Sequence, residues 1–382
     1  MTKGEAMTQL ERLVSGRAWL MKAGALSFVA LMLFGCAPVL LLPVEARLSV
    51  AYKMKAEEPL SDTSNIQAVM TNGQRSHGEK LTPRLVGSLL LAGSKRLGLN
   101  AHLAPTLGGL VLLLSGIAVG HRVTGDRLCG LWVGFTLAGL YVAAACFAMI
   151  GPSKPFDGVA LGFVGLTAWA MGRSWLLGLS AFLGCWTDER VIMSLSFVAL
   201  LIHVSSTLAP EEKRVRWLVI VASVAAYVIS RAVVHQLLGW ETPSTSMMAI
   251  KVPETLLSMQ VVAWTTLEGA WLPMAVALGL LHRDGKRWQL LILVGLLVGG
   301  LGSCVLVLDI SRTAAFSFPL LFVAFAVLKE RGLELARIRH LGAAAAVMSL
   351  LSPNHECVIG FGMRWIPPLP IVSFFLTEQV PS

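Results

Sequence analysis

The chain has 382 residues, of which 55% are hydrophobic and 14% charged, and its mean hydropathy is +0.71. This apolar content exceeds what a water-soluble core can bury, which excludes an ordinary soluble protein and indicates an integral membrane protein. The 31 Lys and Arg residues outnumber the 22 Asp and Glu residues. They are dispersed in short gaps between apolar runs, however, which excludes a basic nucleic-acid-binding surface.

The first apolar run, residues 18–43, predicts a membrane-spanning helix, because about 20 apolar residues cross the hydrocarbon core of a bilayer. It contains an LFGC sequence ending at Cys36, which has some likeness to a lipoprotein cleavage site. The run continues apolar to Pro43, as a retained helix should, and this favours the helix. The six cysteines form no CxxC pair, and we interpret them as small packing residues.

The remaining chain predicts an all-α, polytopic membrane protein with a single transmembrane domain over residues 1–382. After a polar loop, the stretch from Leu85 to Leu99 is too short to span and contains charges, so we expect an interfacial helix. The domain comprises the first helix (18–43), an outer loop with the interfacial helix (44–101), a helical bundle (102–352) and a non-cytoplasmic tail (353–382). The expected spans, about eleven, are 18–43, 102–120, 129–151, 157–172, 174–187, 191–208, 216–239, 255–281, 288–309, 313–328 and 341–352.

The distribution of lysine and arginine predicts the orientation. These residues concentrate in short cytoplasmic loops of membrane proteins. With the N-terminus inside, alternate gaps carry the larger share of them throughout the chain. We therefore expect a multi-pass protein of a bacterial inner membrane with a cytoplasmic N-terminus. Asp157, Asp188, Glu189, Asp309 and Arg312 then all fall on the non-cytoplasmic side.

A polar cluster, Thr187-Asp188-Glu189-Arg190, lies between two apolar runs, where charges are costly and usually mark a working site. The preceding helix of about 14 residues rises roughly 21 Å, less than the hydrocarbon core of about 30 Å. We therefore expect Asp188 and Glu189 in a recess as catalytic carboxylates, with Arg190 beside them to contact substrate. The alternative is that Thr187 or Asp188 caps the next helix, and the pattern favours neither.

A second acid and arginine, Asp309 and Arg312, also join two apolar runs on the same side. A helix cap with a local ion pair is one interpretation of this pair. Because the same combination occurs twice on one side, we favour substrate binding. We expect the two clusters to meet in a common pocket.

Three ionisable residues fall within the predicted membrane interior. Arg231 and His235 are one turn apart on one helix, and Glu268 lies near the centre of the next long helix. One interpretation is a buried Arg231–Glu268 ion pair that fixes the packing of two neighbouring helices. The other is that His235 and Glu268 line the floor of a substrate cavity. The spacing leaves both open.

The long loop supplies further ligand-type side chains. Glu57 and Glu58 are candidate catalytic carboxylates, and Arg84 is a candidate for recognising phosphate through charge-assisted hydrogen bonds. A solvated loop face is the alternative for each. The sequence has no P-loop, HExxH or GxSxG motif. A divalent cation is a candidate cofactor for the carboxylates, although no ligand motif requires one.

The segments GEKLTPRLVGSLLLAGSKRLGLN and KPFDGVALGFVGLTAWAMGRSWLLGLSAFLGCWTDERVIMSLSFVALL resemble polytopic bacterial envelope proteins of the GT-C glycosyltransferase type. The resemblance is one of layout over residues 40–210. It implies a polyprenyl-phosphate-linked sugar donor, an acceptor on the non-cytoplasmic face, and an acid of the first outer loop as base or metal ligand. Glu45, Glu57 and Glu58 are the only acids of that loop before Asp62, and none forms the Asp-containing pair of the family.

Three functions are therefore considered. The first is a transferase that moves a glycosyl or similar group from a polyprenyl-phosphate-linked donor, with a carboxylate as base and arginines offsetting phosphate charge. The second is a transporter or flippase of an anionic or lipid-linked solute, with Arg231, His235 and Glu268 as a relay. The third is a non-catalytic envelope-assembly protein. The excess of charged residues at one face favours the transferase, with membrane lipid and no nucleic acid as partner.

Overall fold

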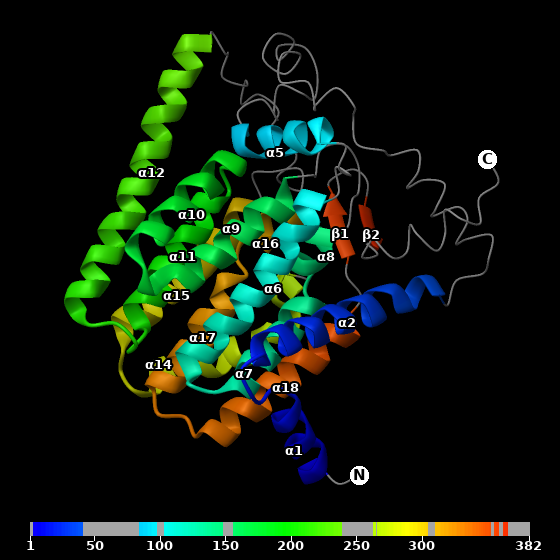
Figure 1. The fold of residues 1–382 in the computed structure, drawn as a ribbon. Helices are drawn as coiled ribbons and strands as arrows, with labels where there is room; N and C mark the ends of the chain where they lie inside the picture. Colours follow the sequence, from blue (N-terminus) through cyan, green and yellow to red (C-terminus); the bar gives the residue numbers. More distant parts are fainter. Residues whose placement is uncertain are drawn as a thin grey trace, which may run out of the picture.

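A computed structural model describes residues 3–40, 84–97, 103–147, 156–238, 263–264, 266–304, 310–352, 355–358 and 362–365 (Figure 1). The elements are α1 (Lys3–Leu13), α2 (Trp19–Leu40), α5 (Leu85–Arg96), α6 (Leu103–Thr124), α7 (Arg127–Gly139), α8 (Tyr141–Phe147), α9 (Asp157–Trp169), η3 (Ala170–Gly172), α10 (Ser174–Thr187), α11 (Val191–Val204), α12 (Pro210–Leu238), η5 (Glu268–Ala270), α14 (Trp271–Arg283), α15 (Arg287–Ser303), α16 (Ile310–Ala315), α17 (Pro319–Glu330), α18 (Leu335–Leu351), β1 (His355–Val358) and β2 (Gly362–Trp365). The predicted all-α class is confirmed, with the addition of a short antiparallel β1–β2 hairpin.

Three stretches in the described part of the chain are long and apolar enough to cross a membrane: Leu103–Thr124, Pro210–Leu237 and Arg312–Glu330. Shorter apolar helices accompany them, including α10 and α11. These helices indicate a membrane-associated protein. The prediction of about eleven spans is not confirmed, because several of the apolar runs form helices of fewer than 18 residues.

Some predicted helices match the structure and others are divided. The helix predicted at 174–187 coincides with α10, and the stretch predicted to be an interfacial helix forms α5. The helix predicted at 129–151 is divided at Leu140 into α7 and α8. The one predicted at 313–328 is broken at residues 316–318, just before Pro319, which has no backbone N–H to continue a helix. An N-terminal helix, α1, was not predicted.

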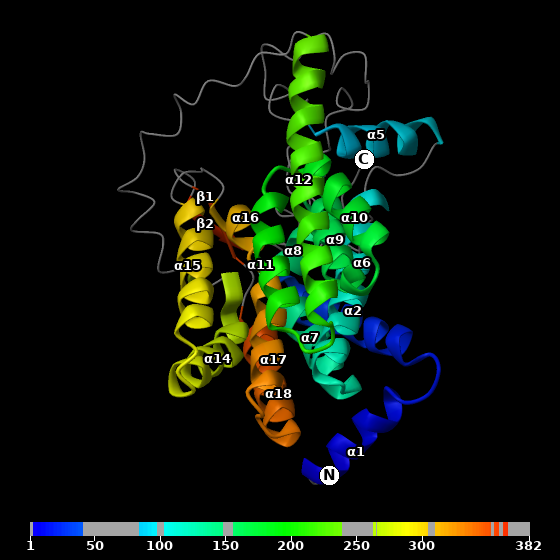
Figure 2. The same cartoon turned by 90° about the vertical axis from the view of Figure 1, so that its left-hand side faces the viewer.

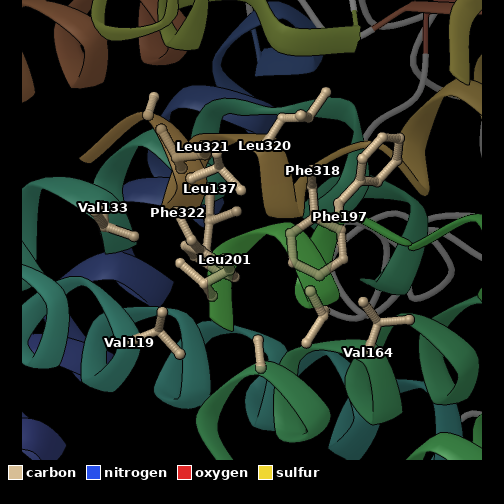
Figure 3. Packing of buried hydrophobic residues seen from close by; sticks show 14 of the residues in the cluster. Val119, Val133, Leu137, Val164, Phe197, Leu201, Phe318, Leu320, Leu321 and Phe322 are labelled. Carbon is tan, nitrogen blue, oxygen red and sulfur yellow. The ribbon is translucent and has the colours of Figure 1, made fainter. Parts of the chain in front are cut away.

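The core of the bundle surrounds α17. Every residue of α17 from Pro319 to Leu328 is buried, and a helix that is apolar on all sides is stable only when other helices enclose it. Figure 3 shows side chains of α6, α7, α9, α11 and α17 converging on this core, with Phe197, Phe318 and Phe322 among the largest. This rigid interior supports the ends of α9, α10 and α11, where the charged residues lie.

Glycine allows α6 and α9 to cross at close range. A Cβ atom added to Gly108 would lie 2.2 Å from the carbonyl oxygen of Gly158, and one added to Gly162 would lie 2.6 Å from the carbonyl oxygen of Gly108. Real Cβ atoms do not approach oxygen so closely. The two backbones are therefore in direct contact, as small residues permit between membrane helices.

The longest helix, α12, packs along α10 and α11 and leaves one side uncovered (Figure 2). Its exposed side chains are largely apolar, including Trp217, Leu218, Val221 and Ile229. Such a continuous apolar surface is typical of a helix that faces lipid. At one end of the bundle, α5 lies across the end of α10, while α1 lies at the opposite end (Figures 1 and 2).

Arg339 connects three elements at the α1 end. Its Nη2 and Nε atoms bind the two carboxylate oxygens of Asp126 at 2.7 and 3.2 Å, and its Nη1 binds Glu11 at 2.7 Å. Asp126 also caps α7 by accepting the N–H of Cys129 at 2.8 Å. Burial opposes ionisation of Asp126, but hydrogen bonds from Arg339 and Cys129 outweigh it and hold the pKa of Asp126 below its ordinary value.

Replacing Asp126 with asparagine is expected to make the stability of the protein less sensitive to acid. Asparagine retains the cap but loses the charge. Because the pKa of Asp126 is lower in the folded protein, its contribution is present above the unfolded pKa of about 3.9 and is lost as pH falls through the folded pKa. Thermal unfolding in detergent from neutral pH downward measures this.

Glu334→Gln is the control, since that side chain is 70% exposed. We expect the difference in melting temperature between wild type and Asp126→Asn to disappear in acid. A difference that persists unchanged in acid would contradict the assigned ion pair.

Candidate functional site

The short link between α10 and α11 is organised by Asp188. One of its oxygens accepts the backbone N–H of Arg190 at 3.0 Å and the Nε–H of the same residue at 2.8 Å, and the other accepts Nη2–H of Arg190 at 2.7 Å. Asp188 is fully buried. Asp188 accepts the backbone N–H of Arg190, the residue just before α11, but no side chain caps the helix itself, so the cap interpretation is not confirmed. The catalytic interpretation of Asp188 stays a prediction.

Asp157, the first residue of α9, joins the two predicted clusters. It accepts a hydrogen bond from Arg190 at 3.0 Å, and Arg312 binds both of its oxygens at 2.5 and 2.8 Å. Arg190 and Arg312 are therefore neighbours in space, as the sequence predicted for the ends of these helices. Asp157 is 4% exposed, so two guanidinium groups compensate a carboxylate removed from water.

Arg84 attaches α5 to this network. It immediately precedes α5, and its two Nη atoms lie 3.1 Å from Asp188 and 3.6 Å from Glu189. A Cβ atom on Gly87 would lie 2.2 Å from the ring of Phe156, so α5 rests directly on the chain just before α9. The arginine and the glycine together fix α5 across this end of the bundle.

Glu189 differs from the other carboxylates because its side chain is 46% exposed. Arg84 lies on one side of it, and Nη1 of Arg231, on α12, lies 3.8 Å away on the other. Arg231 also donates to the hydroxyl of Tyr227, whose ring packs edge-on against Trp186. We call Arg84, Asp157, Asp188, Glu189, Arg190, Arg231 and Arg312 the arginine–carboxylate cluster.

Electrostatics separate the two acids of the α10–α11 link. Burial opposes ionisation of Asp188, but the charges of Arg190 and Arg84 and the hydrogen bonds from Arg190 outweigh it and hold its pKa well below the ordinary value. Asp188 therefore remains ionised at neutral pH and is a weak base. Glu189 is the carboxylate of the cluster that an external molecule can reach.

The other predicted site residues are distributed differently. Glu57, Glu58 and Asp309 lie outside the described residues. His235 is one turn beyond Arg231 on α12, partly buried. The predicted Arg231–Glu268 pair is wrong, because Arg231 faces Glu189 and Tyr227, and neither carboxylate oxygen of Glu268 has a hydrogen-bond partner in the described structure. The physical reason is that α12 packs on α10 and α11, whereas η5 packs on α18.

Comparison with known proteins adds no relative. No family model, curated protein or solved structure matches this chain. The GT-C resemblance therefore stays a prediction from the layout of the sequence. In the described part of the chain, no group of three or more His, Cys, Asp and Glu side chains is placed to hold a metal ion.

Two members of the site were not predicted as site residues. Asp157 was expected on the correct side, but a single acid at the start of an apolar helix has the appearance of a helix-start residue. Tyr227 belongs to an apolar face of α12 and precedes Arg231 by one turn, a spacing that places both side chains together. One feature of the sequence could have identified Asp157 as a site residue. An acid between two apolar runs is costly unless it has a charged partner.

Proposed function

We propose that the protein is a membrane-embedded transferase that moves a glycosyl or similar group from a polyprenyl-phosphate-linked donor to an acceptor hydroxyl. The observation that carries this proposal is the setting of Glu189. It is an accessible carboxylate held between the guanidinium groups of Arg84 and Arg231, at the edge of a buried ionic network. A carboxylate in this position could act as a base on an acceptor hydroxyl. The two arginines beside it could offset the negative charge of a phosphate leaving group.

In the proposed reaction, Glu189 accepts the proton of the acceptor hydroxyl. The acceptor oxygen then bonds to the anomeric carbon of the donor, while the bond from that carbon to the phosphate oxygen breaks. The polyprenyl phosphate leaves with the bonding electron pair, and Arg84 and Arg231 offset its negative charge. Asp188 acts as a positioning residue in this scheme, because it holds Arg84 and Arg190 in place.

We further propose a multi-pass arrangement with the arginine–carboxylate cluster on the non-cytoplasmic side of a bacterial inner membrane. The lysine and arginine bias of the loops supports this orientation. The position of α5 across the same end also supports it, since exposed Leu89 and Leu90 would contact lipid beside Arg84. A lipid-linked donor would then reach Glu189 from the membrane.

The arrangement favours the transferase over the transporter. A relay for alternating access requires its charged groups near the membrane midplane. Arg231 instead contacts Glu189 in the arginine–carboxylate cluster, and Glu268 lies in another part of the bundle. Arg231 therefore belongs to the arginine–carboxylate cluster and forms no relay with Glu268 among the described residues.

Replacing Arg231 with glutamine is expected to weaken binding of a polyprenyl phosphate by about tenfold, because a hydrogen bond to a charged group contributes about 1.5–3 kcal/mol. Isothermal titration of the purified protein in detergent with a polyprenyl phosphate measures this. The matching polyprenol without phosphate is the control ligand, and wild type should bind it less tightly.

Arg214→Gln is the matched control variant, because Arg214 is exposed near the other end of the same helix. It should bind polyprenyl phosphate as wild type does. Equal affinity of the wild type for polyprenyl phosphate and polyprenol would remove the phosphate-recognition part of the proposal.

A further inference from the structure

Glu268 is a buried acid that the proposed transferase site does not use. It opens η5, the short 3-10 turn before α14, and its residue surface is 0% exposed. Neither Oε1 nor Oε2 has a hydrogen-bond partner among the described residues. Each other carboxylate buried in the described structure, Asp126, Asp157 and Asp188, is bound by at least one arginine.

The described elements that pack against η5 place no charged side chain beside Glu268. Its turn packs mainly on α18, and the part of α18 from Gly342 to Leu351 has no ionisable residue. The ionisable residues of α14, His282 and Arg283, are at the far end of that helix, roughly 17 Å away along its axis.

The backbone of Glu268 has an unusual conformation that the neighbouring packing imposes. Its φ of 39° is the one positive φ among the described non-glycine residues. Such a conformation is unfavourable for a residue with a side chain and persists where the surrounding structure imposes it. The next residue supplies that constraint, because a Cβ atom on Gly269 would lie 2.0 Å from the carbonyl oxygen of Ala345, and its N–H donates to Ser349 Oγ at 3.2 Å.

We propose that Glu268 is a proton-binding site inside the helical bundle. An ionised carboxylate without a partner in an apolar interior costs far more than a neutral carboxyl, so the fold seen here holds the acid with its proton. Loss of that proton leaves a charge that the packed η5–α18 contact cannot solvate. Proton release is therefore coupled to movement of η5 away from α18. This inference stands independently of the proposed transfer reaction.

Labelling with a hydrophobic carbodiimide tests the proposal, because this reagent adds to protonated carboxyl groups in apolar surroundings. The purified full-length protein in detergent is treated at neutral and at alkaline pH, and the adduct is located by peptide mass spectrometry. We expect the adduct at Glu268 at neutral pH and its loss at alkaline pH. Asp157 and Asp188, buried but bound by arginine, should remain unmodified and serve as internal controls.

An infrared measurement gives a second readout that does not depend on reagent access. The carbonyl band of a protonated carboxyl should be present in the wild type and lost in Glu268→Gln, which is neutral and of the same shape. Absence of this band from the wild type, or an adduct at Glu268 formed only by a water-soluble carbodiimide, would overturn the proposal. Neither readout involves transfer activity, so failure of the proposed function leaves this test intact.

Discussion

Replacing Arg190 with methionine is expected to lower the free energy of unfolding by about 3–5 kcal/mol, the usual cost of breaking a buried ion pair from one side. Arg190 binds Asp188 through three hydrogen bonds and Asp157 through a fourth, and its guanidinium lies 4.9 Å from the ring centre of Phe316. Of these bonds, the three side-chain contacts disappear in the variant. Two carboxylates then stay buried with fewer positive charges. Unfolding in mixed detergent micelles measures the loss.

Arg283→Met is the matched control for this variant. Arg283 also pairs with an aspartate, Asp284, at 2.8 Å, but its side chain is 66% exposed. Exposed ion pairs contribute roughly 0–1 kcal/mol, so this variant should remain close to wild type. Equal stability of Arg190→Met and Arg283→Met would show that the arginine–carboxylate cluster does not hold the helix ends together.

Replacing Glu189 with glutamine is expected to lower turnover by about 10²–10⁴-fold, the usual contribution of a general base. The amide keeps the shape of the side chain but cannot take the proton of the acceptor. Since Glu189 is 46% exposed, the fold should be unaffected. The measurement is transfer of a labelled sugar from a polyprenyl-phosphate-linked donor by the purified protein, together with donor binding, which should persist.

Glu211→Gln, an exposed acid of α12, is the control and should retain full turnover. Asp188→Asn gives a further contrast. It should reduce stability as well as turnover, because Asp188 holds two arginines in the interior. Wild-type turnover in Glu189→Gln would contradict the assignment of the base and return the choice to the carboxylates of the long loop.

The proximity of Arg190 and Arg312 followed from physical reasoning on the sequence alone, whereas the predicted common pocket with Asp309 lies outside the described residues. Arg190 and Arg312 each follow an apolar run on the same predicted side, and charges between apolar helices must find partners. The identity of the shared partner did not follow, because Asp157 is equally compatible with a simple helix start. The sequence also could not show which of the two adjacent acids is exposed. Asp188 is buried and Glu189 is not, and this difference arises only from how the helices pack.

The expected pairing of Arg231 with Glu268 shows a different limit. Helices that follow each other in a membrane protein are often neighbours in space. Opposite charges at similar depths on two such helices are therefore expected to pair. Here α12 lies on the outside of α10 and α11, and the next run is interrupted at Glu268 itself. A break of this kind has no signal in an apolar sequence, because it is set by the contact of Gly269 with α18.

The direct contact between Gly108 and Gly158 has a consequence for the neighbouring residue, Asp157. The main chains of α6 and α9 are in direct contact there, so no side chain separates the two helices at this point. Asp157 immediately precedes Gly158, so this helix contact determines where its carboxylate lies. Its carboxylate in turn holds Arg190 and Arg312, which both bind it. A molecule that reaches the exposed Glu189 therefore also meets the two arginines of the outer elements, Arg84 just before α5 and Arg231 on α12.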